Sequence, residues 1–178
     1  MSKPARRRGF TLVEVMIGAA LSTFILAGVL STFLFLGRSG ANMQNYSDME
    51  TQARRGLEIF AEDVRQASAI TWNSAESATI VVNSASVTYA YDSSTRIFSR
   101  NGANLITGVT PGSFAFSAFN VAGTEMPLST AAERSAASSS TKQLQITLEA
   151  TRTNTTVVAA TNTVLSARFI LRNKIVTA

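Results

Sequence analysis

A single acidic residue stands inside a long apolar segment near the start of the chain. Gly9 and Phe10 directly follow the basic cluster Arg6, Arg7 and Arg8, and Glu14 lies four residues beyond Phe10. A carboxylate at the centre of a membrane-spanning helix costs roughly 2.5–3.5 kcal/mol, and less near the end of the span, so its presence suggests a function. The acidic residue and the nearby arginines indicate that this function is the pairing of opposite charges.

Two interpretations of Glu14 follow from its surroundings. In the first, the carboxylate lies at the membrane interface, where water solvates it or Arg6–Arg8 pair with it. In the second, its partner belongs to another molecule: a cut after Gly9 would turn the amine of Phe10 into a cation, and Glu14 of one subunit could neutralise that amine on a neighbour. Such pairing would favour ordered lateral packing of helices, because an unpaired buried charge is far more costly than a paired one.

The apolar segment is long enough to cross a membrane. From Val15 to Gly37 the chain has 23 residues without a charge, which at about 1.5 Å of rise per residue spans a hydrocarbon core of ~30 Å. An ordinary signal peptide cut after Ala20 is the alternative, but it would leave the apolar stretch Leu21–Leu36 on the mature chain. The basic cluster before the span predicts a cytoplasmic N-terminus, with the rest of the chain on the other side of the membrane.

The composition of the 178 residues argues against several other functions. The chain has neither Cys nor His, which removes disulfides, thiolate zinc sites and Ser-His-Asp arrangements. Much of the net charge of +5 comes from the N-terminal basic cluster, so we predict no direct binding to nucleic acid. Glu62 and Asp63 are interpreted as surface charge on a helix, and Arg168, Arg172 and Lys174 as a solvated face. We therefore expect no catalytic residues, no metal and no cofactor, and thus no enzyme.

The residues after Gly37 predict a helix followed by strands. Residues 38–69 are interpreted as an amphipathic helix that packs on a following head, with one apolar stripe. Residues 70–178 alternate in polarity as antiparallel strands do, and Asn101-Gly102 is a strong hairpin signal. Residues 121–141 lack a clear period and are expected to form a mobile loop. The predicted fold class is α+β, a long N-terminal helix carrying an antiparallel β-sheet head. The apolar stripe comprises Tyr46, Met49, Ala53, Leu57, Phe60, Val64 and Ala67.

The stretch RRRGFTLVEVMI resembles the conserved start of type IV prepilins and of type II secretion pseudopilins. This resemblance implies that residues 1–9 are a leader, that a prepilin peptidase cuts between Gly9 and Phe10, and that Phe10 is then N-methylated. It also implies that residues 10–37 form a transmembrane and assembly helix, with Glu14 recruiting the subunit into a filament. The partners would be other pilins or pseudopilins through this helix, and inner-membrane lipid before assembly.

Later segments resemble a subset of that family. The stretches LEIFAEDVRQA, SVTYAYDSSTRIFSRNG and SARFILRN look like minor pilins and the J-type minor pseudopilin of type II secretion. The absence of a proline between Pro4 and Pro111, and of a C-terminal cysteine pair, departs from major pilins. We therefore expect a minor subunit of a type IV pilus or a type II secretion pseudopilus. The alternative is a single-pass anchored binding module with an extracytoplasmic head and no filament.

Overall fold

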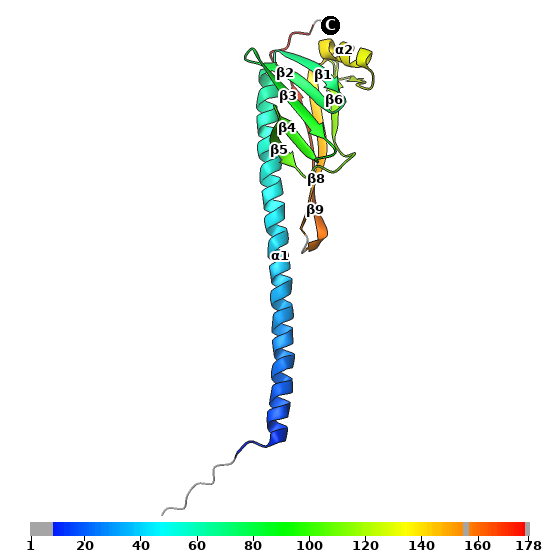
Figure 1. Cartoon of the computed structure of the whole chain (residues 1–178). Helices are drawn as coiled ribbons and strands as arrows, with labels where there is room; N and C mark the ends of the chain where they lie inside the picture. Colours follow the sequence, from blue (N-terminus) through cyan, green and yellow to red (C-terminus); the bar gives the residue numbers. More distant parts are fainter. Residues whose placement is uncertain (1–8, 155–156, 177–178) are drawn as a thin grey trace, which may run out of the picture. The chain divides into compact units, whose positions relative to one another are not determined.

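The computed structural model describes residues 9–154 and 157–176. The chain divides into an N-terminal unit, residues 1–42, and a head unit, residues 43–178, and helix α1 has residues in both (Figure 1). The helices are α1 (Leu12–Gln66) and α2 (Ala131–Ser140). The strands are β1 (Ala69–Ser74), β2 (Ser77–Val82), β3 (Ala85–Asp92), β4 (Ile97–Arg100), β5 (Ala103–Thr107), β6 (Ala115–Phe119), β7 (Glu125–Met126), β8 (Gln143–Asn154) and β9 (Val157–Ile170). One long helix followed by antiparallel strands confirms the predicted α+β class.

The first part of α1 is apolar on every side. It is the one helix in the described part of the chain that is long and apolar enough to cross a membrane. Several of its hydroxyl groups bond within the helix: those of Ser22 and Thr32 donate to the carbonyl oxygens of Gly18 and Gly28, at 2.7 Å and 3.0 Å. These polar side chains therefore need no outside partner in an apolar environment.

A five-stranded antiparallel sheet, β1-β2-β3-β4-β5, forms the first half of the head and follows the order of the chain. The turn between β4 and β5 has positive φ at both central residues, 48° at Asn101 and 79° at Gly102, as the twist of a two-residue hairpin requires. The hairpin predicted at Asn101-Gly102 is therefore confirmed. The turn between β2 and β3 has the same form, with φ of 49° at Asn83 and 67° at Ser84.

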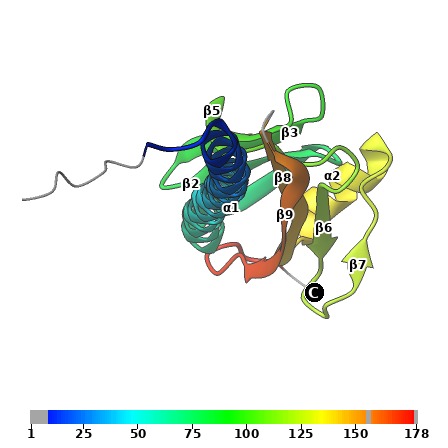
Figure 2. The same ribbon diagram turned by 90° about the horizontal axis from the view of Figure 1, so that it is seen from below.

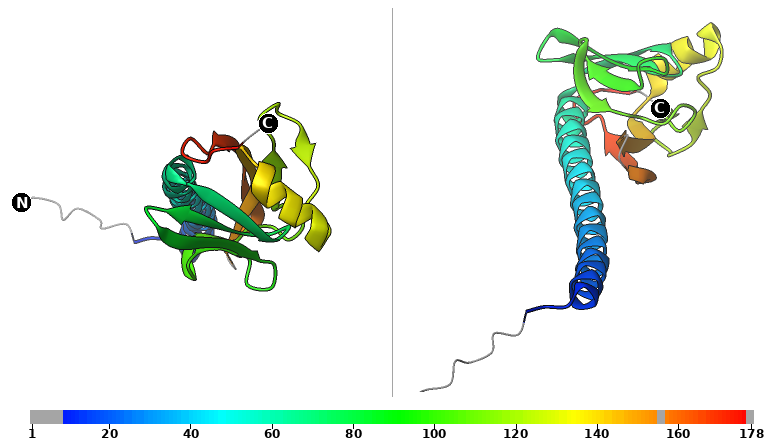
Figure 3. Two further views of the ribbon diagram at one scale, coloured as in Figure 1. Left: turned by 90° about the horizontal axis from the view of Figure 1, so that it is seen from above. Right: turned by 60° about the horizontal axis from the view of Figure 1, so that its bottom comes forward.

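A second antiparallel sheet has the order β7-β6-β8-β9. The expectation of a mobile loop over residues 121–141 is wrong in its secondary structure, because this stretch contains β7 and α2. Thr130 caps α2: its hydroxyl accepts from the N–H of Glu133, and the Glu133 side chain accepts from the N–H of Thr130. Figure 3 shows α2 beside β1, where the N–H of Trp72 donates to Ser138 Oγ at 2.9 Å. Ala and Ser differ little in polarity, so the sequence of α2 shows no clear helical period.

The head part of α1 lies against both sheets (Figure 2). The ring of Phe60 has its centroid 4.8 Å from that of Tyr89 in the first sheet and 5.8 Å from that of Phe169 in the second. Met49, Ala53, Phe60, Val64 and Ala67 of the predicted stripe are buried, Leu57 is partly buried and Tyr46 is exposed. Apart from Tyr46, the stripe thus packs in the core between α1 and the sheets, as the sequence predicted. The helix ends at Gln66, short of the expected boundary at 69.

Asp63 corrects the interpretation of the acidic pair on this helix. It is buried, not surface charge, and it accepts hydrogen bonds from the Tyr89 hydroxyl at 2.6 Å and from Arg100 Nε at 2.7 Å. Burial and this carboxylate raise the pKa of the Tyr89 hydroxyl, which therefore stays a donor. A charge on the inner side of α1 is compatible with the core only because β3 and β4 supply both donors. Glu62, its neighbour, is exposed.

Lys174 is a second correction, since it is buried instead of solvated. Its Nζ donates to the carbonyl oxygens of Ser138, Ser139 and Thr141, at 2.6 Å, 3.0 Å and 3.0 Å. A cation at this position binds the otherwise unpaired carbonyls at the C-terminal end of α2. Asn173 likewise donates to the carbonyl of Gln66, the last residue of α1, at 3.1 Å. The chain after β9 thus binds the ends of both helices.

Gly56 allows α1 to approach β5 closely. A Cβ placed there would lie 2.8 Å from Cγ1 of the buried Ile106. We expect Gly56→Ala to lower the free energy of unfolding by about 1–2 kcal/mol, because overpacking outweighs the gain in helix propensity. In an Ile106→Ala background the same change should instead stabilise the protein, by up to about 1 kcal/mol. Unfolding by urea in detergent micelles, followed by the fluorescence of Trp72, measures both values. A destabilising effect of the same size in both backgrounds would contradict the close contact.

Removal of the Asp63 carboxylate should leave Arg100 without its partner. We expect Asp63→Ala to lower the free energy of unfolding by roughly 2–3 kcal/mol, less than for a fully buried pair because the Arg100 side chain is 35% exposed. The exposed neighbour provides the matched control, since Glu62→Ala should change stability by less than about 0.5 kcal/mol. Equal effects of the two substitutions in the same urea assay would show that Asp63 behaves as surface charge.

Candidate functional site

The start of α1 forms a reciprocal hydrogen-bonded cap. The N–H of Thr11 donates to Oε2 of Glu14 at 2.8 Å, and the Thr11 hydroxyl donates to the same oxygen at 2.9 Å. In return, the N–H of Glu14 donates to the Thr11 hydroxyl oxygen at 3.3 Å. This is the geometry of a capping box, with Thr11 as the N-cap and Glu14 as the third helical residue.

The cap explains part of what a carboxylate does at the start of an apolar helix. The first N–H groups of any helix lack partners inside the helix, and in a dry environment each one left unsatisfied costs several kcal/mol. Glu14 binds one of them, and its negative charge lies at the positive end of the helix dipole. Both of the bonds that it accepts converge on Oε2. Within residues 9–154 and 157–176, the structure gives the second oxygen, Oε1, no hydrogen-bond donor.

The other residues predicted for this site lie before the helix. Gly9 and Phe10 precede its first residue, and the side chain of Phe10 is 88% exposed. The cluster Arg6–Arg8 lies outside the described residues, and so does any pairing of Glu14 with it. The sequence interpretation missed Thr11. The signal was present, because Thr-x-x-Glu directly before an apolar run is the pattern of a capping box.

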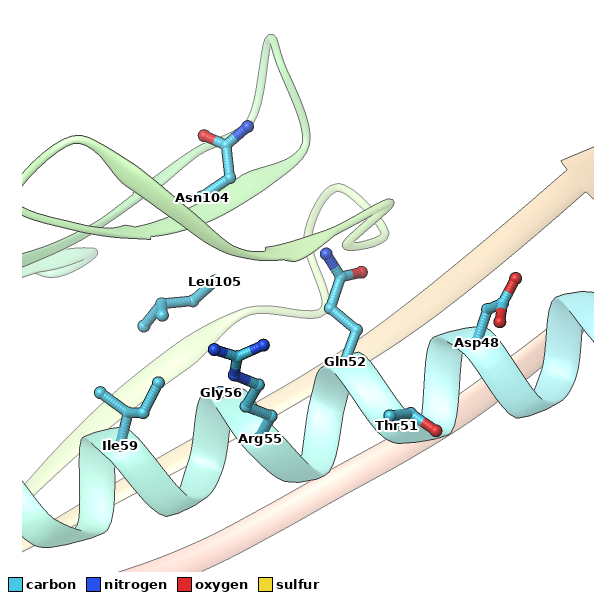
Figure 4. A pocket seen from close by; sticks show the side chains of 8 residues that line it. All are labelled: Asp48, Thr51, Gln52, Arg55, Gly56, Ile59, Asn104 and Leu105. Carbon is cyan, nitrogen blue, oxygen red and sulfur yellow. The ribbon is translucent and has the colours of Figure 1, made fainter.

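A second feature is a groove of about 620 Å³ beside the head part of α1 (Figure 4). Arg55 and Asp48 rise from the same helix two turns apart, and Figure 4 shows their charged ends well separated. Neither side chain makes a hydrogen bond or ion pair in the described part of the chain. Because these charges do not converge on one point, the groove contains no acid–base pair of the kind that catalysis needs. Its lining is Asp48, Thr51, Gln52, Arg55, Gly56, Ile59, Asn104 and Leu105.

Metal-ligating residues do not cluster either. Among the described residues there is no group of three or more His, Cys, Asp or Glu side chains that could hold an ion. The capping box at the start of α1 is therefore the feature that combines an unusual residue with a defined geometry.

Comparison with known proteins points to the same end of the chain. Residues 4–30 match the family described as the prokaryotic N-terminal methylation motif. The chain is also similar to the pilin-like protein PilA3 of Thermus thermophilus, with 32% identity over 68 residues. That alignment covers 38% of this chain and 29% of the relative's length.

The matched residues 4–30 include Thr11, Glu14 and much of the apolar part of α1. The relative is pilin-like, and the α+β fold that follows the motif is the one expected of a pilin. The N-terminal motif, the similarity to a pilin-like protein and the fold together support the assignment of this chain to the type IV pilins.

Proposed function

We propose that this protein is a minor pilin or pseudopilin subunit that assembles through α1 into a type IV pilus or a type II secretion pseudopilus. A prepilin peptidase removes residues 1–9, and Phe10 becomes the N-methylated first residue. The observation that supports this role is Glu14, a capped carboxylate with a second oxygen that no described donor binds, at the start of an exposed apolar helix.

Glu14 has two tasks in this proposal, one for each oxygen. Oε2 stays in the capping box and closes the first turn of its own helix. Oε1 accepts from the Phe10 amine of a neighbouring subunit, which exists only after cleavage at Gly9. A paired carboxylate is tolerated in an apolar helix bundle, whereas an unpaired one is not. The charge therefore favours the assembled state over the isolated subunit in the lipid.

The membrane arrangement follows from the basic leader. Arg6–Arg8 keep the N-terminus in the cytoplasm, α1 crosses the bacterial inner membrane once, and the head lies in the periplasm before it enters the filament. The minor character rests on the looser resemblance of the head segments and on the absence of a proline within α1. As a member of a filament-forming family, the subunit acts by binding other pilins, not by catalysis.

The first prediction concerns processing. When the chain is expressed with a prepilin peptidase, intact-mass spectrometry should find a mature protein that begins at Phe10 and carries one extra methyl group. A catalytically inactive peptidase serves as control and should leave the leader in place. Retention of residues 1–9 beside the active enzyme, or a cut after Ala20, would contradict the proposal and favour an anchored binding module outside any filament.

The second prediction separates the charge of Glu14 from its cap. Glu14→Gln keeps an oxygen that can accept from Thr11 but removes the charge, whereas Glu14→Val removes both. We expect both variants to insert in the membrane and both to fall about tenfold or more in filament incorporation, because each loses the ion pair. Quantitative immunoblotting of sheared filaments and of membranes measures the two pools.

Thr11→Val is the matched control for the cap. It removes the hydroxyl but keeps the charge of Glu14, so incorporation should fall by less than for Glu14→Gln. If Glu14→Gln were incorporated normally while Glu14→Val and Thr11→Val were not, the cap would be the function of this residue and the intermolecular pair would be wrong.

A further inference from the structure

Strand β9 ends the second sheet and is paired with a strand on one side only. Two hydrogen bonds fix the direction of the backbone groups in its neighbour, β8. The N–H of Thr110 donates to the carbonyl of Glu149 at 2.7 Å, and the N–H of Leu171 donates to the carbonyl of Lys142 at 2.9 Å. Odd-numbered residues of this part of β8 therefore face away from β9, and even-numbered residues face it.

The register then gives the direction of the groups on β9. Glu149, Thr147 and Gln145, which face away from β9, pair with even-numbered residues of that strand. In an antiparallel ladder, both members of such a pair point their N–H and C=O groups away from each other. A row of unpaired backbone donors and acceptors thus lies along the outer edge of β9. It belongs to Val164, Ser166, Arg168 and Ile170, which we call the β9 edge.

The β9 edge differs from the other sheet edges in the described part of the chain. The edge of β1 is covered by α2, whose Ser138 accepts from the N–H of Trp72. On β5, the N–H of Thr107 donates to Gln52 of α1 at 3.4 Å, and β7 has only two residues. Val164 and Ile170 of the β9 edge are 67% and 53% exposed. Long open edges are normally blocked in soluble proteins, so an unblocked one indicates a partner.

Arg168 gives this edge a defined charge. Its guanidinium lies 3.5 Å from the centroid of the Phe119 ring, and its Nε donates to Oε1 of Gln145 at 3.0 Å. These contacts hold the exposed side chain in place, while the described residues provide no acceptor for its two terminal nitrogens. A planar guanidinium held in this way is suited to a carboxylate, which it binds through two parallel hydrogen bonds.

We propose that the β9 edge binds an extended strand of a second, non-identical polypeptide. That strand adds to the sheet beyond β9, places apolar side chains beside Val164 and Ile170, and carries an Asp or Glu next to Arg168. Main-chain hydrogen bonds give such a complex its affinity, and the alternating side chains give it specificity. This inference goes beyond the assembly of subunits through α1. It rests on the proposed function in one respect, namely that all subunits cross the membrane in the same direction.

A second copy of this chain fits the edge less well. Pairing between different edges of two copies would need another long open edge. Parallel pairing of β9 with itself about a two-fold axis along the strands would turn one sheet over. Val164, Arg168 and Ile170 of the two copies would then lie on opposite faces, where their side chains cannot pair across the strands. Antiparallel pairing would reverse one copy, because β8 and β9 run along the direction of the head part of α1 (Figures 1 and 3). Subunits inserted with one topology share one direction.

Hydrogen exchange on the purified full-length protein in detergent micelles tests the proposal. The probe is a seven-residue peptide that alternates valine and threonine around a central aspartate, with a lysine at that position in the control peptide. The amides of the β9 edge should exchange fast in the free protein and about tenfold or more slowly with the aspartate peptide at millimolar concentration. Protection without peptide that rises with protein concentration would indicate self-pairing and overturn the proposal, as would no protection by the aspartate peptide.

Two variants show whether the backbone and the charge act as proposed. Ser166→Pro removes one outward N–H without breaking a backbone hydrogen bond to β8, and Pro is tolerated at such edge positions. It also removes the hydroxyl that bonds to Gln145 and Thr147 of β8, and Ser166→Ala removes the same hydroxyl. Ser166→Pro should abolish protection by the aspartate peptide, whereas Ser166→Ala should leave it unchanged. Arg168→Glu should reverse the preference, so that the lysine peptide protects better. Unchanged protection in Ser166→Pro, or an unchanged preference in Arg168→Glu, would contradict strand addition at this edge. Because none of these steps needs leader removal or filaments, failure here is distinct from failure of the proposed assembly role.

Discussion

The packing of Phe60 joins the two sheets of the head to α1. Its ring lies within 6.0 Å, centroid to centroid, of rings from Tyr89, Phe98 and Phe169, and it stacks on Phe116 at the same distance. One residue of the helix thus contacts aromatic side chains from both sheets. Such edge-to-face and stacked pairs add to the large apolar area that each ring buries. Two other features of α1 accompany this close packing: Gly56 at the contact with β5, one turn before Phe60, and Asp63, about one turn after Phe60, with both donors supplied by the sheet.

The same helix must satisfy its polar groups in two different environments. In the apolar part, the Thr11–Glu14 cap and the hydroxyls of Ser22, Thr23 and Thr32 bond back to their own helix. In the head part, several polar groups bond to the sheet, as Asp63 does, or to each other, as in the pair Glu50–Arg54 at 2.6 Å. The two parts differ in the hydrogen-bond partners around them. A lipid environment would supply none, whereas the folded head supplies donors and acceptors from its sheets.

Much of the fold could be predicted because its signals are local. The apolar run, the stripe on the head part of α1 and the Asn101-Gly102 turn each depend on residues close in sequence. The features that were missed depend on distant residues. Whether Asp63 is surface charge or buried anion is decided by Tyr89 and Arg100, 26 and 37 residues away. Lys174 looked solvated because nothing near it in sequence shows that the carbonyls ending α2 need a donor. At the candidate site the position of Glu14 was predictable, whereas its geometry required the recognition of Thr11 as a cap.

The division of tasks along α1 follows from where its side chains find partners. Residues that hold the head, such as Met49, Phe60 and Val64, are buried within the head unit and have no free surface to offer another subunit. Residues of the first part, such as Phe10, Phe24 and Leu36, are exposed within the described part of the chain. Packing them against other helices or lipid therefore costs the head nothing, and a change there leaves the head core unaltered. In the proposed assembly, the first part of α1 would therefore pass from lipid to other helices while the head stays folded, because no contact that stabilises the head has to break.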